Sequence, residues 1–152
     1  MKATIFKLFY LLCLILIITG CEEADTTAPQ ILVTQPAQND TIHAGEQLCI
    51  QVTFTDDAAL NSYKINIHPN FNGHKHIKRP ESAIHNSDQS TEDFEITVTS
   101  QMRNDILTGK NCFRDIDIDI PANATQGIYH LLIYCTDLAG NEAYTAQELV
   151  IN

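Results

Sequence analysis

Strict alternation of apolar and polar side chains is the feature that most constrains the fold of this chain. In CFRDIDIDIP, residues 112–121, Ile116, Ile118 and Ile120 alternate with aspartates. Successive side chains of a β-strand point to opposite faces of the sheet, so this segment reads as a strand with one buried face and one solvated, acidic face. Helices instead need apolar residues three or four positions apart, and the chain after residue 30 has almost no such spacing. The sequence therefore predicts an all-β domain.

The same alternation recurs in short segments that are separated by turn residues. Seven strands are expected: QILVTQP (30–36), EQLCIQVTFTDD (46–57), LNSYKINIH (60–68), DFEITVTS (93–100), CFRDIDIDIP (112–121), GIYHLLIYCTD (127–137) and NEAYTAQELVIN (141–152). We interpret residues 38–40 as a polar turn that follows the first strand. Seven short strands over about 120 residues are typical of an immunoglobulin- or fibronectin-type β-sandwich.

One segment also favours this fold by resemblance. IPANATQGIYHLLIYCTDLAGNEA, residues 120–143, resembles the "IPA…G-x-Y-x-L…D-x-A-G-N" passage of bacterial immunoglobulin-like modules. In those modules a loop leads into the penultimate strand, and a tight Gly-Asn turn begins the last one. The resemblance implies a fold and no activity.

The N-terminus has the form of an export signal. Lys2 and Lys7 precede an apolar run, Leu8–Ile18, which is shorter than the roughly 20 residues that span a bilayer. The run ends in Ile-Thr-Gly-Cys, which resembles the lipobox of lipoproteins and places the obligatory cysteine at Cys21. That resemblance implies a diacylated or triacylated Cys21 as the N-terminus of the exported protein. An ordinary signal peptide is the alternative.

These features divide the chain into a signal peptide (residues 1–20), a lipidated cysteine with its tether (21–29) and one sandwich domain (30–152). Removal of the signal leaves seven Lys and Arg against 19 Asp and Glu, a formal charge of −12. Such a surface argues against nucleic-acid binding. The acidic residues 22–25 resemble a signal for export to the outer leaflet, or they form a solvated linker. We expect a lipid anchor in the outer membrane, with exposure at the cell surface as one outcome.

Three cysteines remain in the predicted domain. Cys49, Cys112 and Cys135 are an odd number, so at most one internal disulfide forms among them, and its connectivity is open. Their spacing is too wide for a zinc-type cysteine cluster.

Histidines gather around the third strand. His68 ends that strand, His74 and His76 follow within eight residues, and His130 lies near the start of the sixth strand. In the immunoglobulin fold the third and sixth strands are antiparallel neighbours, so His68 and His130 meet at one end of a sheet. On each strand the histidine alternates with core residues, so we expect both side chains on the outer face of the sheet. Cross-strand neighbours lie close enough for two imidazoles to share one copper or zinc ion.

The segment 69–92 is long for a loop of a compact domain, and long loops are usually functional or disordered. Its Asn-Phe-Asn-Gly turn (70–73) could return His74 and His76 towards His68, and His85 is a further candidate ligand. The alternative is a polar loop whose imidazoles bind nothing. His43 has no partner in view, and we expect it to be structural or solvated.

A second resemblance covers this segment. SYKINIHPNFNGHKH, residues 62–76, together with the lipobox and the TTAPQI entry to the domain, resembles a family of Gram-negative lipoproteins with a domain of unknown function. Members of that family share an "IH-x-N-F-(D/N)-G-H-x-H" passage. The resemblance supplies no activity.

The opposite end of the predicted sandwich is rich in oxygen ligands. Asp56, Asp57, Asp137 and Asn141 lie in turns there, but no D-x-D-x-D-G spacing is present. Asp137 and Asn141 flank a hairpin turn, in which such side chains commonly bond their own backbone. We therefore do not expect calcium.

No motif of a known catalytic constellation is present, so we do not expect an enzyme. The sequence favours a lipid-anchored, non-catalytic module that binds copper or zinc through His68, His74, His76 and His130. The alternative is an accessory module that binds an outer-membrane protein or a glycan through the same loop. In that case Phe71 and Tyr134 would be contact residues.

Overall fold

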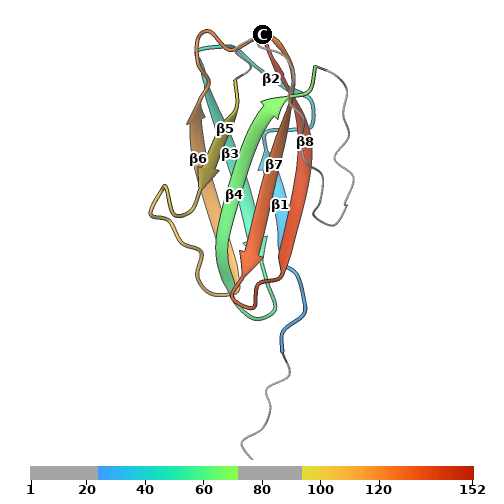
Figure 1. Ribbon diagram of the computed structural model, residues 1–152, viewed down its shortest axis with the longest axis vertical. Coiled ribbons are helices and arrows are strands. Elements are labelled where there is room, and N and C mark those ends of the chain that lie inside the picture. The colour runs from blue at the N-terminus through green and yellow to red at the C-terminus, as the bar shows by residue number, and fades with distance from the viewer. Residues whose placement is uncertain (1–23, 72–93) are drawn as a thin grey trace, which may run out of the picture.

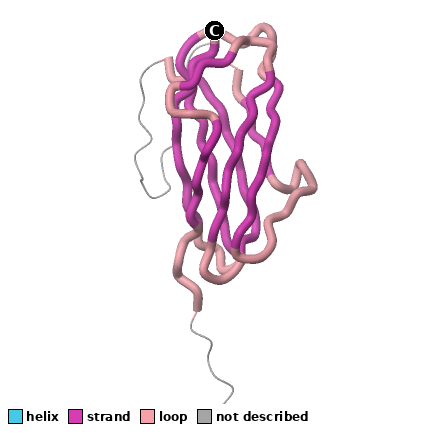
Figure 2. The backbone as a smooth tube through the Cα atoms, turned by 180° about the vertical axis from the view of Figure 1, so that it is seen from behind, coloured by secondary structure: helices cyan, strands magenta, loops and turns pink. Residues whose placement is uncertain are grey.

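The computed structural model describes residues 24–71 and 94–152, and every regular element within them is a β-strand (Figure 2). The predicted signal peptide and Cys21 lie outside the described residues, as do His74, His76 and His85. The strands of the described part are β1 (Gln30–Gln35), β2 (Asp40–Ile42), β3 (Gln47–Thr55), β4 (Leu60–Pro69), β5 (Ile96–Thr99), β6 (Asn111–Asp119), β7 (Gly127–Asp137) and β8 (Glu142–Ile151).

These strands form two sheets that face each other like the layers of a sandwich (Figure 1). One sheet has the order β1-β3-β6, and the other has the order β2-β8-β7-β4-β5. Neighbouring strands are antiparallel except for β2 and β8, which are parallel. The expected pairing of the third and sixth predicted strands is confirmed, because β4 and β7 are antiparallel neighbours.

The described residues contain eight strands, so the prediction of seven was wrong by one. The missed strand is β2, which begins at Asp40, the last residue of the segment that we interpreted as a polar turn. It pairs with only three residues of β8, from Leu149 to Ile151. Three residues are too few to show a period of two, so alternation could not reveal this strand.

Alternation did identify the core. Ile116 and Ile118 of β6 pair with Ile50 and Leu48 of β3, and all four side chains are buried. The intervening aspartates of β6 are exposed, as predicted. The second sheet contributes the other half of the core, and its largest fully buried side chains are Leu60, Ile65, Ile67, Tyr129, Leu131, Ile133 and Leu149.

The outer face of β7 differs from the expectation. His130 and Leu132 were expected to point outward, yet their exposed fractions are only 5% and 2%. Neither residue belongs to the buried core cluster, so both lie on the outer face as parity predicted, although neither is exposed there. Parity gives the direction of a side chain but not how much of its surface is covered.

The two ends of the sandwich carry different chemistry. β4 runs towards the end at which the C-terminus lies, and β7 begins at that same end (Figure 1). The segment from residue 24 to β1 leaves from the opposite end, beside the β3–β4 and β7–β8 turns (Figure 1). Among the described residues no helix is long and apolar enough to cross a membrane.

Candidate metal centre

His68 and His130 face each other as a direct cross-strand pair of β4 and β7. Their ring centroids are 5.5 Å apart, and the ring planes are nearly perpendicular, at 85°. His130 is buried and His68 is partly buried. The predicted meeting of these two imidazoles at one end of a sheet is therefore confirmed.

Asn66 orients the ring of His68. The Nδ2 of Asn66 donates hydrogen bonds to Glu95 Oε1 at 2.9 Å and to Thr97 Oγ1 at 3.1 Å. Its Oδ1 is thereby turned towards His68 Nδ1, with which it forms a short hydrogen bond. An amide oxygen can only accept, so Nδ1 of His68 donates, and the neutral ring then carries its lone pair on Nε2.

Glu148 extends the pair to a row across three strands. It is the β8 partner of His130, and its Oε1 lies 3.8 Å from His130 Nε2. We did not identify Glu148 from the sequence. The sequence could nevertheless have revealed this residue. The β7–β8 turn pairs Thr136 with Glu142, and the same antiparallel register, extended away from the turn, pairs His130 with Glu148.

The described part of the chain supplies only some of the predicted ligands, since His74, His76 and His85 lie outside it. Within that part, ligand atoms of three side chains converge to within 4.8 Å at Cys49, Asp115 and Asp117 and at Asp25, Asp56 and Asp137, and neither group contains a histidine. Any tetrahedral site at the histidine pair thus needs ligands beyond His68 and His130. His43 is exposed in the turn between β2 and β3 and belongs to neither group.

Phe71, one of the two predicted contact residues, lies beside this end of the sheet. Its ring packs edge-on against Tyr129, with centroids 5.6 Å apart, while 44% of the residue remains exposed. It also covers Gly127, where a Cβ atom would come within 2.5 Å of Phe71 Cε1. Because Gly127 also has a φ of +148°, only glycine fits between this ring and the start of β7.

Tyr134, the other predicted contact residue, lies further along β7. Its ring is 5.5 Å from that of Tyr144, and Lys64 Nζ lies 4.0 Å from its centroid. Burial, followed by the charge of Glu142, raises the pKa of the Tyr134 hydroxyl. Tyr134 is thus packed between strand neighbours and is less accessible than Phe71.

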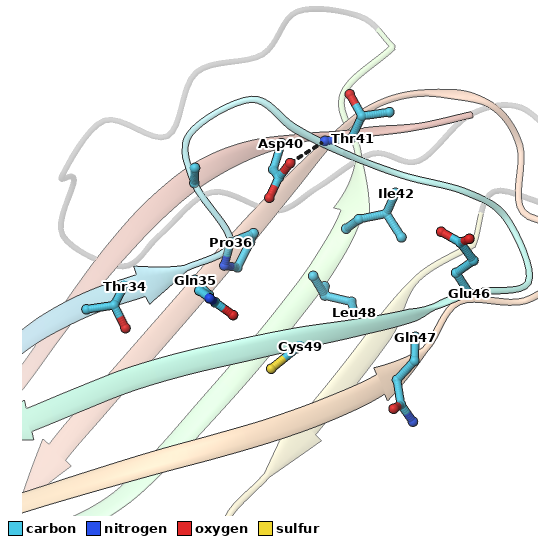
Figure 3. A pocket seen from close by; sticks show the side chains of 11 residues that line it. Thr34, Gln35, Pro36, Asp40, Thr41, Ile42, Glu46, Gln47, Leu48 and Cys49 are labelled. Atoms are coloured by element: carbon cyan, nitrogen blue, oxygen red, sulfur yellow. Dashed lines mark hydrogen bonds between the residues drawn. The ribbon is translucent and has the colours of Figure 1, made fainter.

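A hollow of about 520 Å³ lies beside β2 and the start of β3 (Figure 3). The carboxylate of Asp40 accepts a hydrogen bond from the backbone N–H of Thr41, which the dashed line in Figure 3 marks. The Cys49 thiol at its edge donates to Asp115 Oδ1 at 3.0 Å. None of the described residues that line this hollow is a histidine.

All three cysteines of the predicted domain are free thiols. Cys112 and Cys135 are buried, and Cys49 is partly buried. The disulfide that we left open at the sequence level is thus absent among these described residues.

The described residues thus form an all-β structure with two sheets in a sandwich-like arrangement. A family model described as "Domain of unknown function (DUF4625)" matches residues 19–152, and the chain belongs to this family. The predicted family of unknown function is confirmed to that extent. A comparison with curated proteins finds no match.

Solved structures show distant similarity. OgpA from Akkermansia muciniphila matches with a TM-score of 0.47 and 11% identity over 86% of this chain and 31% of its own. A catalytically inactive OgpA in complex with an O-glycopeptide matches equally, with 10% identity. Spo0M, a sporulation control protein from Bacillus subtilis, matches with a TM-score of 0.44 and 10% identity over 82% of this chain and 49% of its own. The chain spans less than half the length of these proteins, and such distant similarity assigns no activity.

Proposed function

We propose that this protein is a lipid-anchored, non-catalytic module of the cell envelope that binds a copper or zinc ion through His68 and His130. The remaining ligands would come from His74, His76 or His85. The observation that carries the proposal is the direct pairing of the two imidazoles at one end of the sandwich.

The spacing of the rings suits a shared ion. With metal–nitrogen distances of about 2.0–2.1 Å, two imidazoles on one tetrahedral ion have centroids roughly 5 Å apart. The observed separation of 5.5 Å is close to that value, so small rotations about the side-chain bonds would complete the geometry.

The surroundings of the pair also favour a metal ion. The chain of hydrogen bonds from Glu95 through Asn66 to His68 favours the tautomer that coordinates through Nε2. Metal-binding histidines usually have such a partner on the second ring nitrogen, and it raises the basicity of the ligand. Glu148 adds a carboxylate beside His130, which favours a positive charge there.

The finer features of the fold belong to the same proposal. The order β1-β3-β6 against β8-β7-β4-β5, with β2 parallel to β8, supports an immunoglobulin-type sandwich. The lipobox-like sequence before Cys21 supports an anchor in the outer membrane.

One observation favours a second function, in which the same end binds a protein or a glycan. Phe71 and Ile128 expose 44% and 45% of their surfaces beside the histidine pair. Exposed apolar side chains at a strand end are suitable contacts for a partner, with Tyr134 as a further contact along β7.

Calorimetry with the full chain in detergent tests the metal proposal. We expect one Cu²⁺ or Zn²⁺ per chain, with affinity that falls on acidification because protons compete for the imidazole nitrogens. His68→Ala and His130→Ala should each weaken binding by about tenfold or more. The exposed His43→Ala is the matched control and should bind as the parent does. Unchanged affinity in both strand variants would contradict the metal site and favour the interaction module.

A further inference from the structure

The first strand covers only part of the edge of β3. The register of the two strands ends where Gln35 pairs with Gln51, and the chain then crosses to β2, which belongs to the other sheet. β3 itself already begins at Gln47. On the β1 side, the stretch from Gln47 to Cys49 therefore has no partner strand among the described residues, although its other side pairs with β6.

The ladder between β3 and β6 shows which backbone groups point to this open side. Ile120 N donates to the backbone oxygen of Glu46, immediately before β3, at 2.9 Å and in the register of the β3–β6 pair. In an antiparallel pair, hydrogen-bonded and non-hydrogen-bonded residues alternate, so the even-numbered residues of β3 bond to β6. Gln47 and Cys49 therefore each direct one N–H and one C=O to the open edge.

The hollow of about 520 Å³ lies along this open edge (Figure 3). Its volume falls in the range of roughly 300–1,000 Å³ that is usual for ligand pockets. Pro36, Ile42 and Leu48 line it and are buried, whereas Asp40 and Glu46 are exposed and are its only charged lining residues in the described part of the chain. Apolar surface beside carboxylates suits a lysine or arginine side chain, because its aliphatic stem packs on the apolar part and its charged head stays in a polar environment.

We propose that an extended segment of a partner protein, with a lysine or an arginine in it, binds in this hollow as an additional strand beside β3. Its backbone would pair with Gln47 and Cys49, and its basic side chain would lie against Asp40 and Glu46. Addition of a strand to an open sheet edge is a common mode of peptide recognition. Backbone hydrogen bonds supply affinity in this mode, and pockets for alternate side chains supply specificity.

Charge favours a basic partner over a second copy of the chain. An open strand edge can pair with the same edge of another copy. Two copies would bring Asp40 and Glu46 of each chain together, and each chain has a formal charge of −10. Like charges that face each other oppose association, whereas a basic segment would be attracted. The proposal is independent of the copper or zinc site, because His68 and His130 do not line the hollow.

Binding of short peptides to the full chain in detergent tests the proposal. The probes are fluorescent peptides of about five residues, the usual length of a strand, with lysine, arginine or glutamate at the centre and mixtures of valine, threonine and serine around it. Fluorescence anisotropy should show saturable binding of the lysine and arginine peptides and binding weaker by about tenfold or more for the glutamate peptides. Absence of saturable binding by both basic sets would overturn the proposal.

Two double variants test the role of the carboxylates. Asp40→Asn with Glu46→Gln should weaken binding of the basic peptides by about tenfold or more, and both residues are exposed, so the fold should be retained. Asp57→Asn with Glu142→Gln removes the same two charges outside the hollow and should bind as the parent does. Equal affinity in the parent and the first double variant would contradict the site.

Methylation of the peptide backbone separates strand pairing from simple charge attraction. Two lysine peptides carry methyl groups on alternate backbone nitrogens, so that in one the methyl groups face β3 and in the other they face away. Only the first should lose binding. Nuclear magnetic resonance should also show slower deuterium exchange of the Gln47 and Cys49 amides with the unmethylated lysine peptide bound. Equal binding of both methylated peptides, or unchanged exchange at both amides, would overturn the strand addition.

Discussion

At the scale of the residue, Cys49 shows how a neighbouring strand controls the chemistry of one side chain. Its thiol donates to Asp115 Oδ1 on β6. This hydrogen bond, followed by burial and by the charges of Asp115 and Asp117, raises the pKa of the Cys49 thiol to about 11. The thiolate is the nucleophile and the metal ligand, so Cys49 is a poor candidate for either role at neutral pH.

The raised pKa predicts slow alkylation of Cys49. At pH 8 a thiol with a pKa of about 11 is roughly 0.1% ionised, so iodoacetamide should modify Cys49 far more slowly than an ordinary exposed cysteine. Asp115→Asn removes the charged acceptor and should lower the pKa, and the rate measured by mass spectrometry at pH 8 should therefore rise. Asp119→Asn, on the same face of β6, is the control. Equal rates in the parent and Asp115→Asn would contradict the role of Asp115.

At the scale of the element, the two sheets depend on the alternating apolar faces of β6 and β7. Ile118 pairs with Leu48 on β3, and Leu131 pairs with Ile67 on β4. Ile118 and Leu131 are both buried in the common core. Lys64 lies on the outer face of β4, where its ammonium group rests over the ring of Tyr134.

The loss of stability on truncating a side chain of these strands should increase with the burial of that side chain. Ile118→Ala and Leu131→Ala should each reduce the free energy of unfolding by about 2–5 kcal/mol, because each leaves a cavity in the core. Lys64→Ala should cost about 0.5–1 kcal/mol at most, which is the usual range of an exposed cation–π contact. Urea denaturation monitored by circular dichroism gives the three values. A larger loss for Lys64→Ala than for either core variant would show that the assigned faces are reversed.

At the scale of the whole molecule, the sandwich separates two kinds of side-chain chemistry. Imidazole nitrogens lie at the end where β4 finishes and β7 begins, and carboxylate oxygens lie at the end from which residue 24 leads back to Cys21 (Figure 1). Under our proposals the carboxylate end faces the membrane and the histidine end faces away from it. The fold would thus present its transition-metal site at the greatest distance from the anchor.

The anchor itself is testable by mass spectrometry of the protein purified from membranes. We expect an N-terminal Cys21 that carries two or three acyl chains, because one chain alone binds a membrane only weakly. Cys21→Ser should release the protein from the membrane fraction, with Cys49→Ser as the control that stays bound. A purified protein that retains Cys13 would contradict the lipobox interpretation.

The sequence by itself determined seven of the eight strands of the described residues and the side chains that they direct into the core. The period of two along residues 112–121 and 127–137 identified the core-facing residues of β6 and β7, because alternation is a local property of the pleat, although the other face of β7 is also buried at His130 and Leu132. Parity and the strand order of an immunoglobulin-like fold were also enough to bring His68 and His130 together. Whether they bind a metal ion stays a prediction.

Only the tertiary structure decided that Asp25 lies beside Asp56 and Asp137, two turn residues that the sequence had already placed at one end of the sandwich. Asp25 precedes Asp56 by 31 residues and Asp137 by 112 residues, so no short sequence motif predicts that the three side chains lie together. Likewise the burial of His130 and Leu132 on the outer face of β7, and the pairing of the short strand β2 with the edge of β8, are evident only in the tertiary structure. These features depend on which distant segments lie side by side. Packing of the whole chain determines that arrangement, and the local order of residues does not.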